Sequence, residues 1–215
     1  MKYIIMCGGK YKGWAEPRQL SYIGHERVIE RTIRLLRENG INDISISTND
    51  SIFEQFGVPV LRHYNSFVQY GALECNYWTD AFYPICGPVC YLMGDVVFSP
   101  EAIRTIIETE TDDIEFFASA PPFSHLYTKP WAEPFSFKVV DQEHFCKSIK
   151  MVEHLQDIGA FNRPPIAWEL WQVIKETPLN KIDYSNYTVI NDYTCDIDTP
   201  ADAVKLAQLI EREDE

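Results

Sequence analysis

The sequence predicts a single α/β domain, a three-layer α/β/α sandwich with a mostly parallel, mixed central sheet and a Rossmann-like nucleotide-binding half. The chain of 215 residues suits one domain, and a chain of this size buries roughly 70% of its unfolded surface. Its 46% hydrophobic and 24% charged residues are ordinary for a globular protein. Over residues 1–120, strand-like runs alternate with helical stretches in units of about 25–30 residues, the pattern of βαβ units around a parallel sheet.

The strands expected in this part are short apolar or alternating runs at 2–7, 43–48, 58–61, 89–93 and 114–118. The first run is too uniformly apolar for a half-exposed strand and suits a strand buried on both faces. The helices expected between these strands cover 26–39, 51–56, 67–81 and 100–108. Apolar residues recur at helical spacing in the first helix, and Asn39-Gly40 predicts its end, while Pro100 predicts the start of the last one.

The regular alternation breaks between residues 121 and 134, where four prolines interrupt the chain. Beyond this irregular stretch the pattern predicts strands at 135–140 and 186–190 and helices at 142–155, 166–175 and 200–212. The sequence contains no internal repeat and no linker that would separate two domains. We therefore treat residues 1–215 as one domain.

The charge balance limits the partners of this domain. Lys and Arg number 19 and Asp and Glu number 32, which gives a formal net charge of −13. Sequence-independent binding to nucleic acid requires a basic face and is excluded. A small phosphorylated substrate remains compatible with this charge if local cations or a metal offset the acidic field.

Cysteine usage and hydropathy indicate a cytoplasmic protein with reduced thiols. None of the six cysteines forms a CxxC pair, so a zinc site is not expected. No stretch approaches the ~18 consecutive apolar residues of a membrane span. The apolar N-terminal run lacks the length and cleavage site of a signal peptide, so we expect it to be a buried strand.

The first candidate for chemistry is the segment Gly8-Gly9-Lys10-Tyr11-Lys12-Gly13, which follows the first expected strand. Glycines let backbone N–H groups approach a phosphate, and three cations, Lys10, Lys12 and Arg18, gather here in an acidic chain. The spacing matches neither a P-loop nor a dinucleotide-binding fingerprint. A turn that merely requires glycine is the alternative interpretation.

The second candidate is Asp95, which follows Gly94 at the carboxyl end of a buried strand. Ligands of open α/β sheets bind outside the carboxyl ends of strands. A carboxylate in this position suits Mg²⁺, which takes one or two carboxylates together with phosphate oxygens. The alternative is a cap for the loop before Pro100.

The third candidate is the pair Asp196 and Asp198, whose spacing places both side chains on one face of an extended segment. Two neighbouring carboxylates repel each other, which favours a metal between them. The alternative is capping of the helix that begins at Pro200, with Asp198 or Thr199 at the N-cap and Asp202 in the first turn.

In their order and separation these segments resemble the GT-A-like nucleotidyltransferases, which include cytidylyltransferases and sugar-1-phosphate nucleotidyltransferases. The matching residues are Met6-Cys7-Gly8-Gly9, Pro17-Arg18-Gln19-Leu20, Gly94-Asp95 and Asp196-Ile197-Asp198-Thr199-Pro200. The resemblance covers most of the chain and leaves the substrate open. It implies a nucleotide-binding half at 1–120, an acceptor-binding half at 121–190, and a metal motif with a terminal helix at 191–215.

The sequence departs from the family pattern in two places. Tyr11 and the pair Lys12-Gly13 stand where the family's loop carries a further glycine and an arginine, and Arg18 replaces the usual lysine. Arginine keeps the charge but presents a planar fork rather than a point charge. A weakened enzyme or a nucleotide-binding relative without turnover is therefore an alternative.

The resemblance implies Mg²⁺ held by Asp95, Asp196 and Asp198, and catalytic roles for Lys12, Arg18 and Asp95. The residues that it implies at the nucleoside triphosphate are Cys7, Gly8, Gly9, Lys10, Lys12, Arg18, Tyr70, Gly71, Ala72 and Gly94. The stretch around Tyr70 would read the base, and the small Gly71 and Ala72 would admit it, with ordinary packing as the alternative. Short cytidylyltransferases are nearest in length, so CTP is the favoured nucleotide.

For the acceptor we expect Glu133 to receive an amine or hydroxyl and Lys138 a phosphate, with Trp168, Glu169 and Trp171 as a second aromatic and acidic patch. The alternative is that these aromatic residues belong to the core or to a dimer surface. The five histidines show no ligand spacing, and we interpret them as surface or loop residues.

The function predicted from the resemblance is Mg²⁺-dependent transfer of a nucleotidyl group to a small phosphorylated acceptor. Pyrophosphate would leave, and the product would be an activated precursor for surface polysaccharide, lipid or related biosynthesis. We expect no nucleic acid or membrane partner, and a homodimer is possible on the sequence. A GT-A glycosyltransferase is a further alternative, which would require an Asp-x-Asp at mid-chain rather than near the C-terminus.

Overall fold

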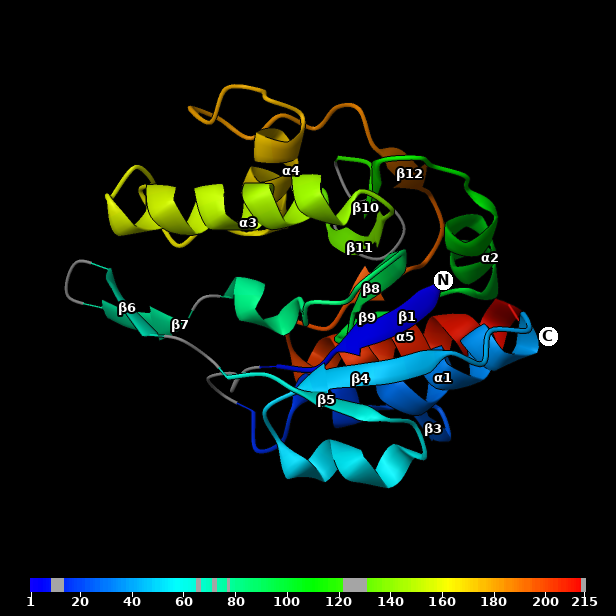
Figure 1. The fold of residues 1–215 in the computed structure, drawn as a ribbon. Coiled ribbons are helices and arrows are strands. Elements are labelled where there is room, and N and C mark those ends of the chain that lie inside the picture. The colour runs from blue at the N-terminus through cyan, green and yellow to red at the C-terminus, as the bar shows by residue number, and fades with distance from the viewer. Residues whose placement is uncertain (9–13, 65–66, 71–72, 77, 122–130, 214–215) are drawn as a thin grey trace.

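A seven-stranded mixed sheet forms the centre of the molecule in the computed structural model (Figure 1), which describes residues 1–8, 14–64, 67–70, 73–76, 78–121 and 131–213. The strand order is β12-β10-β11-β8-β1-β4-β5, and every strand except β11 runs in the same direction. The strands are β1 (Lys2–Met6), β4 (Ile44–Thr48), β5 (Val60–Arg62), β8 (Val89–Met93), β10 (Ile114–Ser119), β11 (Pro134–Val139) and β12 (Thr188–Ile190). The predicted mostly parallel, mixed sheet is therefore confirmed.

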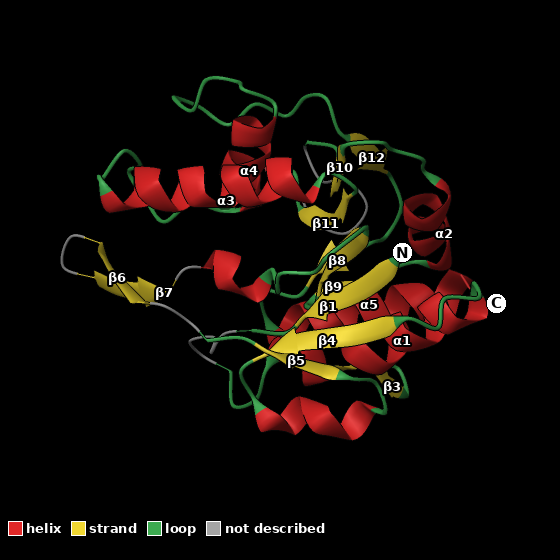
Figure 2. Ribbon diagram, in the orientation of Figure 1, coloured by secondary structure: helices red, strands yellow, loops and turns green. Residues whose placement is uncertain are grey.

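Helices cover both faces of the sheet, which confirms the three layers (Figure 2). One face packs against α1 (Val28–Glu38), α2 (Pro100–Glu108) and α5 (Pro200–Glu213), and the other against α3 (Gln142–Asp157) and α4 (Ala167–Ile174). Strand β1 shows how the two cores arise from one sequence. Its side chains alternate between them, with Tyr3 and Ile5 on the α1 side and Ile4 and Met6 on the α3 side.

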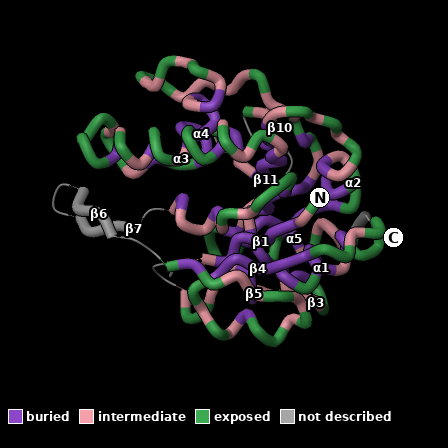
Figure 3. The backbone as a smooth tube through the Cα atoms, in the orientation of Figure 1, coloured by how far each residue is buried: buried purple, intermediate pink, exposed green. Residues whose placement is uncertain are grey.

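The central strands are buried on both faces, as Figure 3 shows for β1 and β4. The core on the α3 side is built mainly from aromatic rings around Phe116. Its ring centroid lies 4.4 Å from that of Phe137, 5.0 Å from that of Trp168 and 5.4 Å from that of Trp171. Both tryptophans are 1% exposed, so they belong to the core, which was the alternative to an acceptor-binding patch.

Local capping determines where the helices begin and end. The Ser99 hydroxyl accepts a hydrogen bond from the backbone N–H of Ala102 at 2.8 Å and is followed by Pro100, so α2 begins where the sequence predicts. Helix α1 begins two residues later than predicted, because Glu26–Arg27 forms the short strand β3, which pairs with β2 (Tyr22–Ile23). Asn39 and Gly40, the latter with φ of 79°, end α1 as expected.

The helix predicted over residues 67–81 is wrong. The described parts of this region form two antiparallel strands, β6 (Phe67–Tyr70) and β7 (Leu73–Asn76), followed by a 3₁₀ helix at Trp78–Ala81. Aromatic and β-branched residues in 67–70 favour a strand, and a central glycine weakens a helix by about 1 kcal/mol. The interrupted apolar pattern therefore reflects two antiparallel strands and not a helix.

Among the described residues, no helix combines the length and the apolar character that crossing a membrane requires. Cys7 and Cys90 are buried thiols of the central strands, whereas Cys86 and Cys146 are exposed. Burial raises the pKa of Cys90 to about 12, so this thiol stays protonated at neutral pH.

Candidate functional site at the carboxyl edge of the sheet

The candidate site lies where the parallel strands end. Gly8 follows β1, and Gly94 and Asp95 follow β8. Because β11 runs in the opposite direction, Glu133, which precedes it, reaches the same edge. Open α/β sheets bind their ligands at this edge.

Gly94 has to be a glycine for steric reasons. Its backbone N–H donates to the carbonyl oxygen of Met6 at 3.0 Å, so the turn after β8 lies directly against the end of β1. A Cβ atom on Gly94 would lie 2.3 Å from that oxygen and 2.8 Å from Sγ of Cys7. The close approach fixes where Asp95 emerges from the sheet.

A small two-stranded sheet brings the C-terminal acidic segment to Asp95. Strand β9 (Val96–Val97) pairs with β13 (Cys195–Asp196), and the N–H of Ile197 donates to the backbone oxygen of Asp95 at 3.0 Å. Residues about 100 positions apart in the chain are thereby joined by main-chain hydrogen bonds. The predicted meeting of the second and third candidate segments follows from this pairing.

Capping of α5 explains Asp202 but leaves the Asp198 carboxylate in the site. Oδ2 of Asp202 accepts hydrogen bonds from the backbone N–H groups of Asp198 at 3.1 Å and Thr199 at 2.7 Å. The indole of Trp14 donates to the backbone oxygen of Asp198 at 3.2 Å. The main chain of Asp198 is held from both sides, so its side chain has a defined direction.

Arg18 lies between two of the predicted metal ligands. It belongs to the 3₁₀ helix Arg18–Leu20 (η1). One guanidinium nitrogen, Nη1, lies 3.5 Å from Oδ2 of Asp95, 3.2 Å from Oδ1 of Asp198 and 3.1 Å from the backbone oxygen of Ile197. The loop after β1, the turn after β8 and the start of α5 meet at this side chain.

Three carboxylates form a cluster whose donor set fits a divalent cation. Oxygens of Glu133, Asp196 and Asp198 all lie within 4.8 Å of one another. Hard oxygen donors of this kind are the ligands of Mg²⁺. The set differs from the predicted one, because Glu133 joins the two C-terminal aspartates, while Asp95 is linked to Asp198 through Arg18.

Several hydrogen bonds hold Glu133 in place. The Trp131 indole donates to its Oε1 at 2.8 Å, and its backbone N–H donates to the Ser119 hydroxyl at 2.8 Å. The indole of Trp168 donates to the backbone oxygen of Ala132 at 3.0 Å. Trp168 thus supports the segment that carries Glu133 from within the core, instead of lining a binding patch.

Lys138 lies apart from this cluster, contrary to the expected phosphate contact, and Glu169 has a capping role at the start of α4. Lys138 pairs with Cys90 near the amino end of β8, so it belongs to the opposite half of the sheet. Its Nζ donates to the carbonyl oxygens at the end of α2, at 3.0 Å to Ile106 and 2.9 Å to Ile107, and burial lowers its pKa. Glu169 caps α4 and pairs with Arg163 at 2.6 Å.

His63 is a site residue that the sequence interpretation missed. It is 7% exposed rather than a surface residue, and its ring lies beside Gly8. The Ser47 hydroxyl donates to the Ala81 backbone oxygen at 2.7 Å and lies 2.9 Å from Nδ1 of His63. Since a hydroxyl has one proton, Nδ1 carries the ring proton and donates to Ser47. The sequence offered one signal for this contact: Ser47 and His63 lie at or just beyond the ends of two consecutive expected strands.

Part of the predicted nucleotide site lies outside the described residues. This holds for Gly9, Lys10, Lys12, Gly71 and Ala72, and for the side chain of Tyr70. Cys7 and Gly8 are described, and the N–H of Cys7 donates to the Ser47 backbone oxygen at 2.8 Å. Burial and the nearby Asp95 raise the pKa of the Cys7 thiol.

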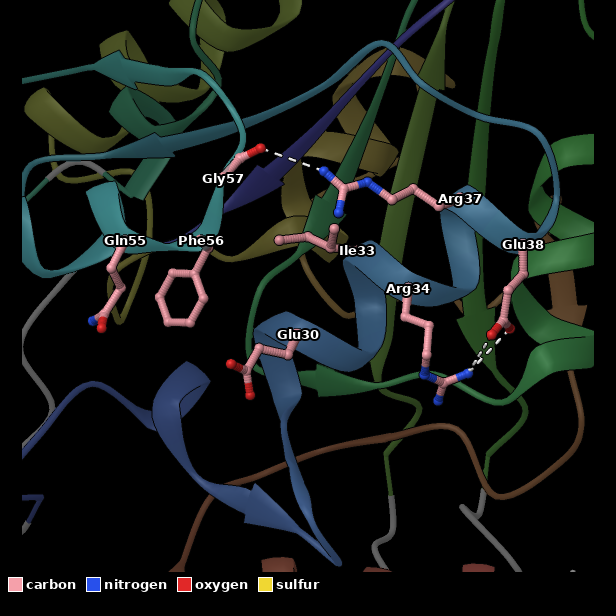
Figure 4. A pocket seen from close by; sticks show the side chains of 8 residues that line it. All are labelled: Glu30, Ile33, Arg34, Arg37, Glu38, Gln55, Phe56 and Gly57. Carbon is pink, nitrogen blue, oxygen red and sulfur yellow. Dashed lines mark hydrogen bonds and ion pairs between the residues drawn. The ribbon is translucent and has the colours of Figure 1, made fainter.

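A pocket of about 470 Å³ opens elsewhere, between α1 and the 3₁₀ helix Ser51–Phe56 (Figure 4). Its walls include Ile33 and Phe56, and Arg34 lies beside Glu38 at 3.0 Å. None of the predicted site residues lines it. The pocket is therefore separate from the carboxylate cluster.

No protein-family model and no curated protein sequence matches the chain. Solved structures match over nearly its whole length. A Bacillus anthracis protein described as a glucose-1-phosphate thymidylyltransferase has a TM-score of 0.59 at 15% identity, covering 97% of this chain and 94% of its own. The inositol-1-phosphate CTP transferase from T. maritima has a TM-score of 0.59 at 14% identity, covering 98% and 96%. The chain shares the fold of these two transferases.

HddC from Yersinia pseudotuberculosis, complexed with GMP-PN, is also similar, with a TM-score of 0.54 at 13% identity, covering 97% of this chain and 99% of its own. The three proteins match this nucleotidyltransferase fold from end to end. At these identities the likeness concerns the fold. The activity has to be argued from the residues at the carboxyl edge.

Proposed function

We propose that this protein is a Mg²⁺-dependent nucleotidyltransferase, with cytidylyl transfer favoured. The observation that carries the proposal is the meeting of Arg18, Asp95, Asp196, Asp198 and Glu133 at the carboxyl edge of the sheet. In the reaction, an oxygen of the acceptor phosphate attacks the α-phosphorus of a nucleoside triphosphate. A new P–O bond forms there, the bond to the β-phosphate oxygen breaks, and pyrophosphate leaves.

The chain's residues would act by positioning and charge. Asp196 and Asp198, with Glu133 or Asp95, would hold the cation, whose chemistry is to neutralise charge on the phosphates. Arg18 can bind a phosphate with two parallel hydrogen bonds, while Lys10 and Lys12 remain the proposed contacts to the β- and γ-phosphates. A general base is unnecessary, because a phosphate nucleophile is already ionised near neutral pH.

The nucleotide would lie over the ends of β1 and β4, with its phosphates toward Arg18. We favour CTP because the sequence resembles short cytidylyltransferases, and Tyr70, Gly71 and Ala72 remain the proposed base contacts. The described residues support only the edge of this site, where Gly8 meets His63.

The acceptor would enter from the side of β11. Glu133 supports this assignment, because its buried carboxylate lies beside the two aspartates and is aligned by Trp131. A phosphorylated alcohol, with a hydroxyl or amine directed at Glu133, is the substrate class that we propose. The product would be an activated precursor for polysaccharide or lipid synthesis, made in the cytoplasm, and a homodimer remains part of the proposal.

Pyrophosphate release tests the proposal. The protein is incubated with Mg²⁺, each nucleoside triphosphate in turn and a panel of phosphorylated sugars, polyols and amino alcohols. We expect release only when both substrates are present, fastest with CTP. Tight nucleotide binding without release from any pair would instead identify a non-catalytic relative, and release of a nucleoside diphosphate from a nucleotide sugar would identify a glycosyltransferase.

A further inference from the structure

The guanidinium of Arg18 lies between the carboxylates of Asp95 and Asp198. Its Nη1 lies 3.5 Å from the Asp95 carboxylate and 3.2 Å from the Asp198 carboxylate. The side chains of Arg18 and Asp95 are partly shielded from water, with exposed fractions of 17% and 20%, whereas Asp198 is exposed at 44%. Shielding of this kind strengthens attraction between opposite charges and repulsion between like charges.

The backbone around Arg18 is held in place by hydrogen bonds and by burial of a neighbouring side chain. The N–H of Leu20 donates to the Pro17 backbone oxygen at 2.9 Å, and the N–H of Ser21 donates to the backbone oxygen of Arg18 at 2.9 Å. Leu20 is buried at 5% exposure. A guanidinium on this fixed base can turn from the carboxylates toward a phosphate without refolding of the segment.

A divalent cation and the guanidinium compete for the same oxygens. Two cations a few ångströms apart in a partly shielded site repel each other. A phosphate offers the guanidinium a partner for two parallel, charge-assisted hydrogen bonds. Arrival of a triphosphate therefore gives Arg18 an alternative to Asp95 and Asp198.

We propose that Arg18 is a built-in counter-ion that competes with the divalent metal for Asp95 and Asp198 until nucleotide phosphates draw it away. Metal alone then binds weakly, and metal and nucleotide bind cooperatively. The inference rests on the proposed function, since it presumes a metal and a nucleotide at this edge. It adds that, without ligands, the positive charge of Arg18 offsets the negative charges of Asp95 and Asp198.

Mn²⁺ binding to the nucleotide-free protein, followed by electron paramagnetic resonance, tests the inference without any turnover. Arg18→Met removes the charge and keeps the length of the side chain, and we expect it to tighten Mn²⁺ binding at least tenfold. Arg18→Lys should give an intermediate affinity. Arg104→Met is the matched control, because it also removes one positive charge, from an exposed pair with Glu101.

A second readout is thermal unfolding of the same variants in EDTA and in saturating Mn²⁺. Arg18→Met should be less stable than the wild type in EDTA, and it should gain more from Mn²⁺ than the wild type or Arg104→Met. Mn²⁺ affinity of Arg18→Met within twofold of the Arg104→Met control, or below it, would overturn the inference. Tightened Mn²⁺ binding without pyrophosphate release by the wild type would refute the proposed function and leave the counter-ion role standing.

Discussion

The imidazole of His63 donates its Nδ1 proton to the hydroxyl of Ser47, across 2.9 Å, at the end of two adjacent parallel strands. The hydroxyl in turn donates to the backbone oxygen of Ala81 at 2.7 Å. The ring is thereby fixed with its Nε2 edge against Gly8, where a Cβ atom would lie 3.0 Å from Nε2. His63 supports the start of the loop proposed to bind the triphosphate.

Replacing His63 by Ala should raise KM for the nucleoside triphosphate about tenfold and change kcat by less than about twofold. The reason is that His63 positions Gly8 and takes no part in bond breaking. His63→Asn, whose amide can still donate to Ser47, should recover part of the loss. Steady-state kinetics with varied nucleotide distinguishes the two variants, and an unchanged KM in His63→Ala would refute the positioning role.

Replacing Gly94 by Ala should destabilise the protein by about 3 kcal/mol, because a side chain there overlaps the Met6 carbonyl. Urea unfolding followed by circular dichroism measures the difference. Gly159→Ala is the control, because Gly159 has φ of 70° and nothing within 4 Å of its added Cβ. The control should lose only about 1 kcal/mol from backbone strain. Equal losses at both positions would contradict the close approach of β8 and β1.

Replacing Lys138 by Met should leave both KM values unchanged and lower the free energy of unfolding. Lys138 caps carbonyl groups at the end of α2 and lies away from the carboxylate cluster. A marked rise in the KM of Lys138→Met for the acceptor would instead support the phosphate contact predicted from the sequence.

The difference in unfolding free energy between the wild type and Lys138→Met should depend on pH. Burial lowers the pKa of Lys138 below its ordinary 10.5, so the unfolded chain binds more protons than the folded chain between the two values. The contribution of Lys138 to stability should therefore increase as pH rises from the lowered folded-state pKa toward 10.5. Urea unfolding at several alkaline pH values should show the wild type gaining relative to Lys138→Met, and the opposite trend would contradict the burial of the charge.

Replacing Glu133 by Gln should weaken Mn²⁺ binding about tenfold, because one of three clustered carboxylates loses its charge. Calorimetric titration with Mn²⁺ gives the affinity. Glu211→Gln is a matched control, since this exposed residue lies at the far end of α5, about 15 Å along the helix from its start. If both variants bind Mn²⁺ alike, Glu133 is not a ligand.

The fold was predictable because periodicity reflects burial. Alternating apolar runs and helical stretches predicted all seven strands of the central sheet, and Pro100 and Asn39-Gly40 predicted where helices begin and end. The region 67–81 failed, because short apolar runs of hairpin strands mimic helical spacing.

Site residues were predictable where residues close in the sequence are also close in space. Asp196 and Asp198 are two residues apart, so their meeting follows from an extended backbone. Glu133 joins them only because β11 runs antiparallel to β8, and local sequence does not encode strand direction. Lys138 was placed wrongly because β11 runs away from the site: Lys138 lies opposite Cys90 near the amino end of β8, whereas Glu133 precedes β11 at the other edge. The position of His63 in the site follows from the pairing of β4 with β5, which local sequence does not encode.

Nucleotidyl transfer itself is tested most directly with a nucleoside triphosphate labelled at the α-phosphorus. After incubation with Mg²⁺ and the phosphorylated acceptor panel, the label should appear in an acceptor-linked nucleoside diphosphate while the released pyrophosphate stays unlabelled. Asp198→Asn should lower this transfer at least about 100-fold, since its carboxylate lies in both the acidic cluster and the Arg18 pair. Label that stays in the triphosphate with every acceptor, or transfer that survives Asp198→Asn undiminished, would contradict a nucleotidyltransferase site at this edge of the sheet.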